Sequence, residues 1–79
     1  MNGDLRDRIE KRDLTMGVIG LGYVGLPLAV EMAKAGYSTL GFDVAADVVD
    51  GVNAGRSHIG DVSGEELAPL VRGGGLRAT

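Results

Sequence analysis

Three glycines at fixed spacing, Gly20, Gly22 and Gly25, and one carboxylate, Asp43, are the residues whose types and positions could do chemistry. A G-x-G-x-x-G loop can bring bare backbone close to the pyrophosphate of a dinucleotide. The amides of such a loop, together with the positive end of the helix that follows, attract phosphate oxygens. A carboxylate about 20 residues further on can accept hydrogen bonds from a ribose. The pattern therefore indicates a dinucleotide site.

Each glycine of this loop has a separate expected role. Gly20 permits the tight turn out of a strand, Gly22 leaves room for the pyrophosphate, and Gly25 lets the helix pack close to the strand. The amides of Gly22, Tyr23 and Val24 are expected to face the phosphates. The Tyr23 ring has two open interpretations, since it could shield the cofactor or simply pack against the protein.

The carboxylate of Asp43 favours NAD over NADP. It would repel a 2′-phosphate, and no Lys or Arg lies between Asp43 and Gly55 to receive one. Two alternatives stay open. The loop could be a glycine-rich turn that binds nothing, with Asp43 only capping the helix that starts near Ala45. A methyl-donor nucleotide site also pairs a glycine loop with an acidic residue after the second strand.

The elements that must position these residues are predicted in the order strand, helix, strand. Residues 16–20 are a short apolar run typical of a buried parallel strand. Residues 24–35 predict a helix, and residues 37–42 predict a second strand that ends at Asp43. The apolar positions of the helix expected to recur on one face are Val24, Leu28, Met32 and Ala35.

The second half of the chain predicts two more helices. Residues 45–53 form a short amphipathic pattern, and Ser63 with Glu66 matches a capping box that starts the next helix. The inward positions of the first of these helices are expected to be Val48, Val49 and Val52. Residues 76–79 look like the start of another extended segment, and the third parallel strand is expected to lie beyond the chain. The predicted fold class is α/β, a partial doubly wound (Rossmann-type) parallel sheet of which the chain supplies only the first β-α-β-α portion.

Composition excludes several classes of protein. The chain has 79 residues, no cysteine and a single histidine, His58, which rules out disulfide scaffolds, zinc ribbons and cysteine nucleophiles. A net charge of −3 and 4% aromatic residues argue against nucleic acid as a partner. His58 has no metal-ligand partner at a suitable spacing and is expected to be an exposed loop residue.

Residues 1–14 are expected to be a charged lead-in, either a salt-bridged helix or a disordered segment. Residues 15–79 are expected to form an incomplete NAD-binding domain. The uncharged residues 16–30 could imitate a signal peptide, but they contain four glycines and a proline. They are also too few for a membrane span, which needs about 20 residues. A cytoplasmic protein with no membrane association is therefore expected.

Residues 18–29, VIGLGYVGLPLA, resemble the amino-terminal signature of the nucleotide-sugar 6-dehydrogenases. The resemblance continues through residues 41–43, the loop from Asn53 to Ile59, Glu66-Leu67 and residues 76–79. The family includes UDP-glucose, UDP-N-acetylhexosamine and GDP-mannose dehydrogenases. The charged residues 5–13 are similar to the branch that oxidises UDP-N-acetylhexosamines.

This resemblance implies NAD as the cofactor, with Asp43 at its ribose. The residues it places at the pyrophosphate are Gly20, Leu21, Gly22, Tyr23, Val24 and Gly25. It assigns no chemistry to the loop from Asn53 to Ile59.

The same resemblance implies that the chain is part of a longer oxidoreductase, a homo-oligomer that acts in polysaccharide biosynthesis. This enzyme would oxidise the C6 alcohol of a nucleotide sugar to a carboxylate. A UDP-N-acetylhexosamine or UDP-glucose is the favoured substrate. No catalytic residue is expected here, because the catalytic cysteine of that family has no counterpart in a chain without cysteine. The chain alone is accordingly expected to be inactive. The alternative is a non-catalytic glycine-loop fragment that binds a nucleotide and acts only through a partner.

Overall fold

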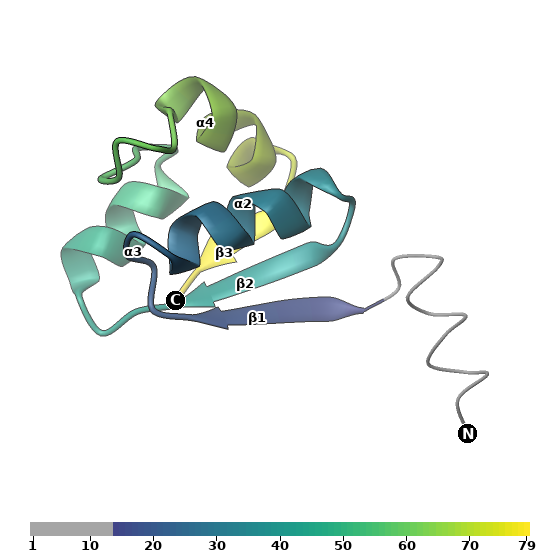
Figure 1. Ribbon diagram of the computed structural model, residues 1–79, viewed down its shortest axis with the longest axis horizontal. Helices are drawn as coiled ribbons and strands as arrows, with labels where there is room; N and C mark the ends of the chain where they lie inside the picture. Colours follow the sequence, from purple (N-terminus) through teal and green to yellow (C-terminus); the bar gives the residue numbers. More distant parts are fainter. Residues whose placement is uncertain (1–13) are drawn as a thin grey trace.

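The computed structural model describes residues 14–79, so the expectations for residues 1–13 lie outside the described residues. The elements in chain order are β1 (Thr15–Ile19), α2 (Gly25–Lys34), β2 (Ser38–Phe42), α3 (Ala46–Asn53), α4 (Gly64–Arg72) and β3 (Leu76–Ala78). They form two layers, with all three helices on the same face of the sheet (Figure 1). None of these helices has the length and apolar character needed to cross a membrane.

The sheet is parallel throughout, with strand order β1-β2-β3. Thr15 lies opposite Ser38 in the first pair, and Thr39 lies opposite Leu76 in the second. This is the strand order of one half of a doubly wound sheet, so the predicted fold class is confirmed. The expectation that the third parallel strand lies beyond the chain is wrong, because residues 76–78 already pair with β2. A strand of three residues directly after three glycines is too short to show a clear sequence pattern.

The core fills the space between the sheet and the helices. Strand residues that alternate along each strand point into it, among them Val18, Thr39 and Leu76. The largest side chains that are fully buried are Leu21, Leu26, Leu67, Leu76, Val30 and Val52. Because Leu21 belongs to the glycine loop, the loop itself is anchored in this core.

The face that α2 buries differs from the prediction. The buried residues are Leu26, Ala29, Val30 and Ala33, whereas Val24 is 79% and Leu28 is 46% exposed. Both sets have helical spacing, since α2 is apolar on most of its sides and the periodic pattern alone cannot choose between them. The choice is made by a tertiary contact at Gly25, which brings one side of the helix against the end of β1.

The two later helices largely follow their predicted patterns. Ser63 caps α4 by accepting a hydrogen bond at its Oγ from the Glu66 amide at 3.1 Å. The Glu66 carboxylate lies 2.9 Å from Lys34 Nζ and so links α4 to α2, and this hydrogen bond raises the pKa of Lys34. In α3, Val52 is buried, while the two preceding valines are half-buried against the core.

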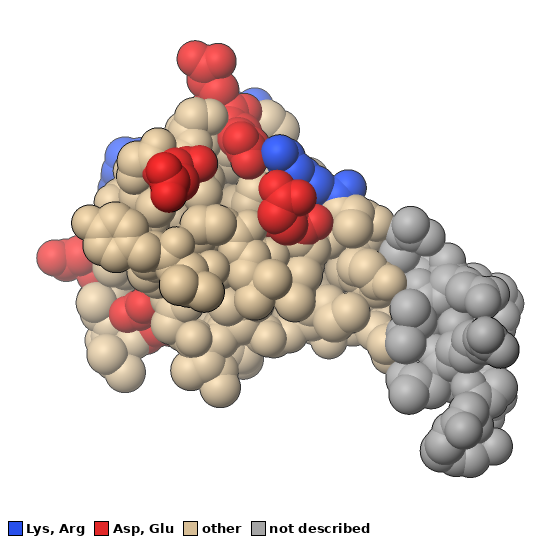
Figure 2. Space-filling model, in the orientation of Figure 1, with Lys and Arg blue, Asp and Glu red and all other residues tan. Residues whose placement is uncertain are grey.

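The opposite face of the sheet has no helix over it within residues 14–79 (Figure 1). Strand alternation directs Ile19, Leu40, Phe42 and Arg77 to this side. Ile19 is 90% exposed and Phe42 is 40% exposed. In the same orientation, most of the charged side chains visible in Figure 2 lie over the helical layer. We refer to this surface, formed by Ile19, Leu40 and Phe42, as the open apolar face.

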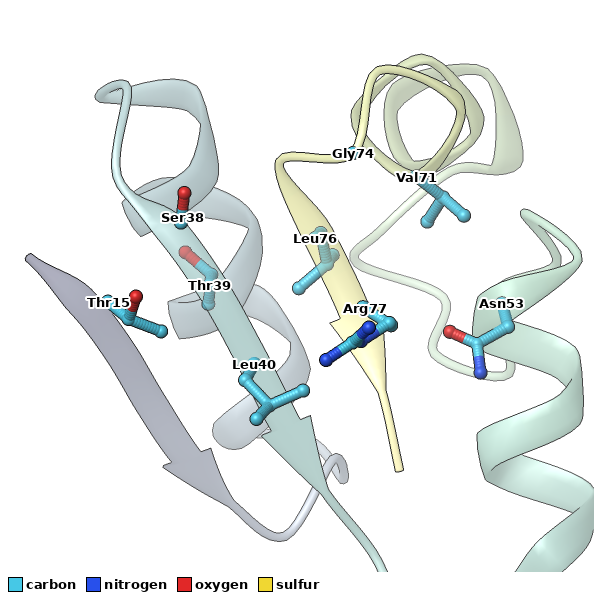
Figure 3. Close-up of a pocket in the computed structure, with 9 residues that line it drawn as sticks. All are labelled: Thr15, Ser38, Thr39, Leu40, Asn53, Val71, Gly74, Leu76 and Arg77. Atoms are coloured by element: carbon cyan, nitrogen blue, oxygen red, sulfur yellow. The ribbon is translucent and has the colours of Figure 1, made fainter.

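The outer edge of β3 is covered by a side chain rather than by another strand. Asn53, the last residue of α3, donates from Nδ2 to the Ala78 carbonyl at 2.9 Å. Its Oδ1 accepts from the Ala78 amide at 2.8 Å. Figure 3 shows Asn53 across from β3, on the side away from β2. Because the ladder bonds of Ala78 on that side are taken, the Asn53 amide occupies the place of a further strand.

Candidate functional site

The glycine loop joins β1 to α2 and is shaped by two glycines. Gly20 has φ of 85°, a backbone conformation that side-chain-bearing residues rarely adopt, and its amide donates to the Phe42 carbonyl at 2.7 Å. A Cβ at Gly25 would lie 1.6 Å from the Gly20 carbonyl oxygen. The chain itself therefore requires a turn at Gly20 and a close approach at Gly25, as the sequence predicts for these two positions.

Gly22 lies between them and is different. A Cβ at this position would meet nothing within 4 Å. The described residues therefore give no packing reason for a glycine here. An open position at the centre of the loop is what a ligand that approaches the backbone would need.

The start of α2 presents free amides beside this open position. Among the hydrogen bonds of residues 14–79, none is donated by the amides of Gly22, Tyr23 or Val24. Val24 makes no side-chain cap, and the first turn of α2 holds no acidic residue. Unpaired amides and the positive end of a helix attract a negatively charged group, so this loop can hold an anion such as a pyrophosphate.

Asp43 follows β2 and ties the glycine loop to the end of that strand. Its Oδ2 accepts from the Leu21 amide and its Oδ1 from the Ala45 amide, both at 2.9 Å. The Leu21 amide, then the Ala45 amide and, to a smaller extent, the nearby His58 ring lower the pKa of Asp43 from its ordinary value of 3.8. The group is therefore an anion at neutral pH. Each oxygen keeps a lone pair for a further donor.

Of the other predicted site residues, Leu21 is buried and Tyr23 is exposed. The Leu21 side chain is fully buried and its amide is occupied by Asp43, so Leu21 holds the loop in place. Tyr23 is 82% exposed, so its ring is not packed into the described core. The hydrogen bond from the Ala45 amide to Asp43 fits the alternative that Asp43 only caps the following helix. That alternative does not account for the hydrogen bond from the Leu21 amide to Asp43.

A hollow of about 320 Å³ lies beside Asp43, at the carboxyl ends of the strands. It is lined by Ile19, Gly20, Phe42, Asp43, Val44 and Thr79. A larger hollow of about 540 Å³ lies among residues that begin the strands, including Thr15, Ser38 and Leu76 (Figure 3). Ligands of open parallel sheets bind at the carboxyl ends of the strands, so the smaller hollow belongs to the candidate site.

His58 also contacts the candidate site, although no pattern in the sequence predicts a role for it there. It is exposed, as predicted, but its Nε2 donates to the Leu21 carbonyl at 2.5 Å. The two residues are 37 positions apart. No local pattern reports a contact at that separation, and the only pointer in the sequence is that His58 lies in the loop from Asn53 to Ile59 that resembles the family.

Residues 14–79 match the model of the UDP-glucose/GDP-mannose dehydrogenase family, NAD binding domain. The UDP-N-acetyl-D-mannosamine dehydrogenase of Salmonella typhi is 42% identical over 66 residues, which cover 82% of this chain and 16% of that protein. The enzyme of the same name from Pyrococcus horikoshii is 41% identical over 46 residues, which cover 58% of this chain and 11% of the relative.

Solved structures give the same picture. The UDP-D-ManNAc dehydrogenase of Pyrococcus horikoshii superposes with a TM-score of 0.76 at 34% identity, covering 84% of this chain and 16% of that one. A UDP-glucose dehydrogenase from Pyrobaculum islandicum superposes with a TM-score of 0.72 at 33% identity, covering 82% and 15%. The chain thus spans only a small part of the proteins it matches. Since the family match extends over all the described residues, the chain belongs to the UDP-glucose/GDP-mannose dehydrogenase family and falls within its NAD-binding domain.

Proposed function

We propose that residues 20–25 and Asp43 bind NAD. The observation that carries this proposal is the glycine loop, where three adjacent amides have no acceptor among the described residues. They belong to Gly22 and the two residues after it, and no contact in the described chain requires a glycine at position 22. A loop with these two properties is suited to a pyrophosphate.

The residues of the site fit the other parts of NAD as well. The free lone pairs of Asp43 would accept hydrogen bonds from the ribose hydroxyls, and its negative charge would oppose a 2′-phosphate. Ile19 and Val44, which line the hollow beside Asp43 and are largely exposed, offer apolar surface for the adenine. When bound, NAD supplies the hydride acceptor of a dehydrogenase. This chain's own residues bind and orient it.

We further propose that the chain belongs to an enzyme that oxidises the C6 alcohol of a UDP-sugar to a carboxylate. Relatives named for UDP-N-acetyl-D-mannosamine and for UDP-glucose support this substrate class. Of these two substrates, we favour the UDP-N-acetylhexosamine, because of the relatives named for UDP-N-acetyl-D-mannosamine. The cytoplasm and a homo-oligomer are the proposed setting. We assign no catalytic residue to the 79 residues, and expect no turnover from them alone.

The experiment that tests the binding proposal is a calorimetric titration of the chain with NAD. Replacing Gly22 by Ala puts a methyl group where the pyrophosphate would approach, and we expect NAD affinity to fall about 10- to 100-fold. The fold should survive, because a Cβ at Gly22 meets nothing within 4 Å.

Gly60→Ala is the matched control, since a Cβ there also meets nothing within 4 Å and Gly60 lies outside the glycine loop. Both variants should keep the circular dichroism spectrum of the parent chain. NAD binding that is equal in all three proteins, or absent from the parent chain, would contradict the proposal.

A further inference from the structure

We propose that His58 is a positioning residue for the cofactor: by donating from Nε2 to the Leu21 carbonyl, it aims the Gly22 amide at the pyrophosphate. This inference rests on the proposed function, because it gives His58 a role in the same NAD site. It reaches beyond it because His58 lies outside the glycine loop and the strand end that carry that proposal.

The geometry of the peptide bond connects the two residues. The Leu21 carbonyl and the Gly22 N–H belong to one planar, trans peptide unit, so they point in opposite directions. A bond that holds the carbonyl toward His58 therefore fixes the N–H on the opposite side of the chain. That N–H is one of the three amides without an acceptor among the described residues.

The Leu21–Gly22 peptide needs this hydrogen bond because Gly22 does little to restrict its orientation. Glycine readily adopts alternative backbone conformations, and Gly22 has open space around it. Rotation of the Leu21–Gly22 peptide would turn the N–H away from the ligand. The preceding peptide is fixed by the bond from the Leu21 amide to Asp43. His58 supplies the second hold, so the loop is fixed on both sides of Leu21.

His58 can act in this way because its own loop is fixed. Ser57 Oγ donates to the Ile59 carbonyl at 2.9 Å and accepts from the Ile59 amide at 3.1 Å. The Ile59 side chain is 5% exposed and packs in the core. The Arg56 amide donates to the Gly51 carbonyl at 2.8 Å. The ring is therefore carried between anchored neighbours, and its positive form also lowers the pKa of Asp43 across the loop.

The test compares two replacements of His58 in the 79-residue chain. His58→Ala removes the donor, and we expect NAD affinity to fall about 3- to 10-fold, the effect of losing one hydrogen bond. His58→Gln keeps an N–H donor at a similar distance from the backbone and should stay within about twofold of the parent. Asp61→Ala is the control, because Asp61 is an exposed residue of the same connection between α3 and α4 and should leave affinity unchanged.

A second measurement separates positioning from general loosening of the fold. The carbonyl ¹³C shift of Leu21 reports the hydrogen bond directly, so it should move in His58→Ala, return toward the parent value in His58→Gln and stay constant in Asp61→Ala. If His58→Ala moves this shift and NAD binds with unchanged affinity, the inference is overturned while the proposed function stands. An unmoved shift would also overturn it. If the parent chain itself fails to bind NAD, both fall.

Discussion

The carboxylate of Asp43 is used twice by the chain before any ligand is considered. One oxygen accepts the Leu21 amide of the glycine loop and the other accepts the Ala45 amide ahead of α3. A helix cap accounts for only the second of these bonds. The first connects two strand ends that are far apart in sequence, which places an anion beside the open Gly22 position. This arrangement is what allows a selectivity test at a single residue.

Replacing Asp43 by Ala should weaken NAD more than NADP. NAD loses the hydrogen bonds of its ribose hydroxyls to a charged acceptor, which corresponds to about a 10- to 100-fold loss of affinity. NADP should lose much less, because removal of the carboxylate also removes its repulsion of the 2′-phosphate. Calorimetric titrations of the parent chain and the variant with both cofactors give the comparison.

Asp43→Asn is the matched control for charge, since it keeps the size of the side chain and one acceptor oxygen. It should relieve the repulsion of NADP as Asp43→Ala does. An equal loss for both cofactors, or no loss for either, would reduce Asp43 to a structural cap.

Among the elements, those with local signals were predictable and those decided by distant contacts were not. The cap at Ser63 and the strand β1 are both indicated by residues close together in the sequence, and the structure confirms both. The predicted buried face of α2 is wrong. This helix has two rows of apolar residues with helical spacing, and a contact at Gly25 selects the row that is buried. An extended segment is predicted to start at residue 76, but the prediction that the third parallel strand lies beyond the chain is wrong, because the three residues of β3 carry too little sequence pattern to identify a strand.

The candidate site divides along the same line. The glycine loop and Asp43 are separated by a strand, a turn and a helix with a familiar order, so their meeting could be predicted. Asn53 meets Ala78 across 25 positions, and His58 meets Leu21 across 37. Both contacts depend on how helices and loops return to the sheet, which residue types and local spacing do not specify.

The edge contact of β3 leads to a prediction about stability. Asn53→Asp keeps the shape of the side chain but replaces the Nδ2 donor by an oxygen, which would face the Ala78 carbonyl. We expect the free energy of unfolding to fall by about 1–3 kcal/mol, the cost of an unsatisfied and repelled acceptor. Urea denaturation followed by circular dichroism measures this change.

The control is Asp50→Asn, which alters charge by one unit on the same helix at an exposed position. It should leave the free energy of unfolding within about 0.5 kcal/mol of the parent value, as is usual at surface sites. If both variants behave alike, the bonds between Asn53 and Ala78 do not stabilise the edge.

For the molecule as a whole, the two faces of the sheet are unequal. Three helices cover one face, while the open apolar face has no cover within residues 14–79 (Figure 1). Large apolar side chains exposed together favour association in water. We expect the 79-residue chain to self-associate through this face as its concentration rises.

Ile19→Lys places a charge at the most exposed apolar side chain of that face and should require about tenfold or more protein to reach the same degree of association. Leu28→Lys makes the same kind of change on α2, in the other layer, and should have little effect. Sedimentation velocity over a range of concentrations distinguishes them. Association that responds equally to both changes, or no association at all, would contradict this expectation.

The parallel strand order also determines which contacts of a nascent chain can form first as it leaves the ribosome. Thr15 pairs with Ser38, which is made 23 residues later, so β1, α2 and β2 leave the ribosome before the loop around His58 does. Phe42, the end of β2, precedes His58 by 16 residues. At about 5–20 residues per second, that delay is roughly 1 to 3 s. During this interval the glycine loop already exists without its second hold, so translation itself briefly produces the loosened site that His58→Ala would make permanent.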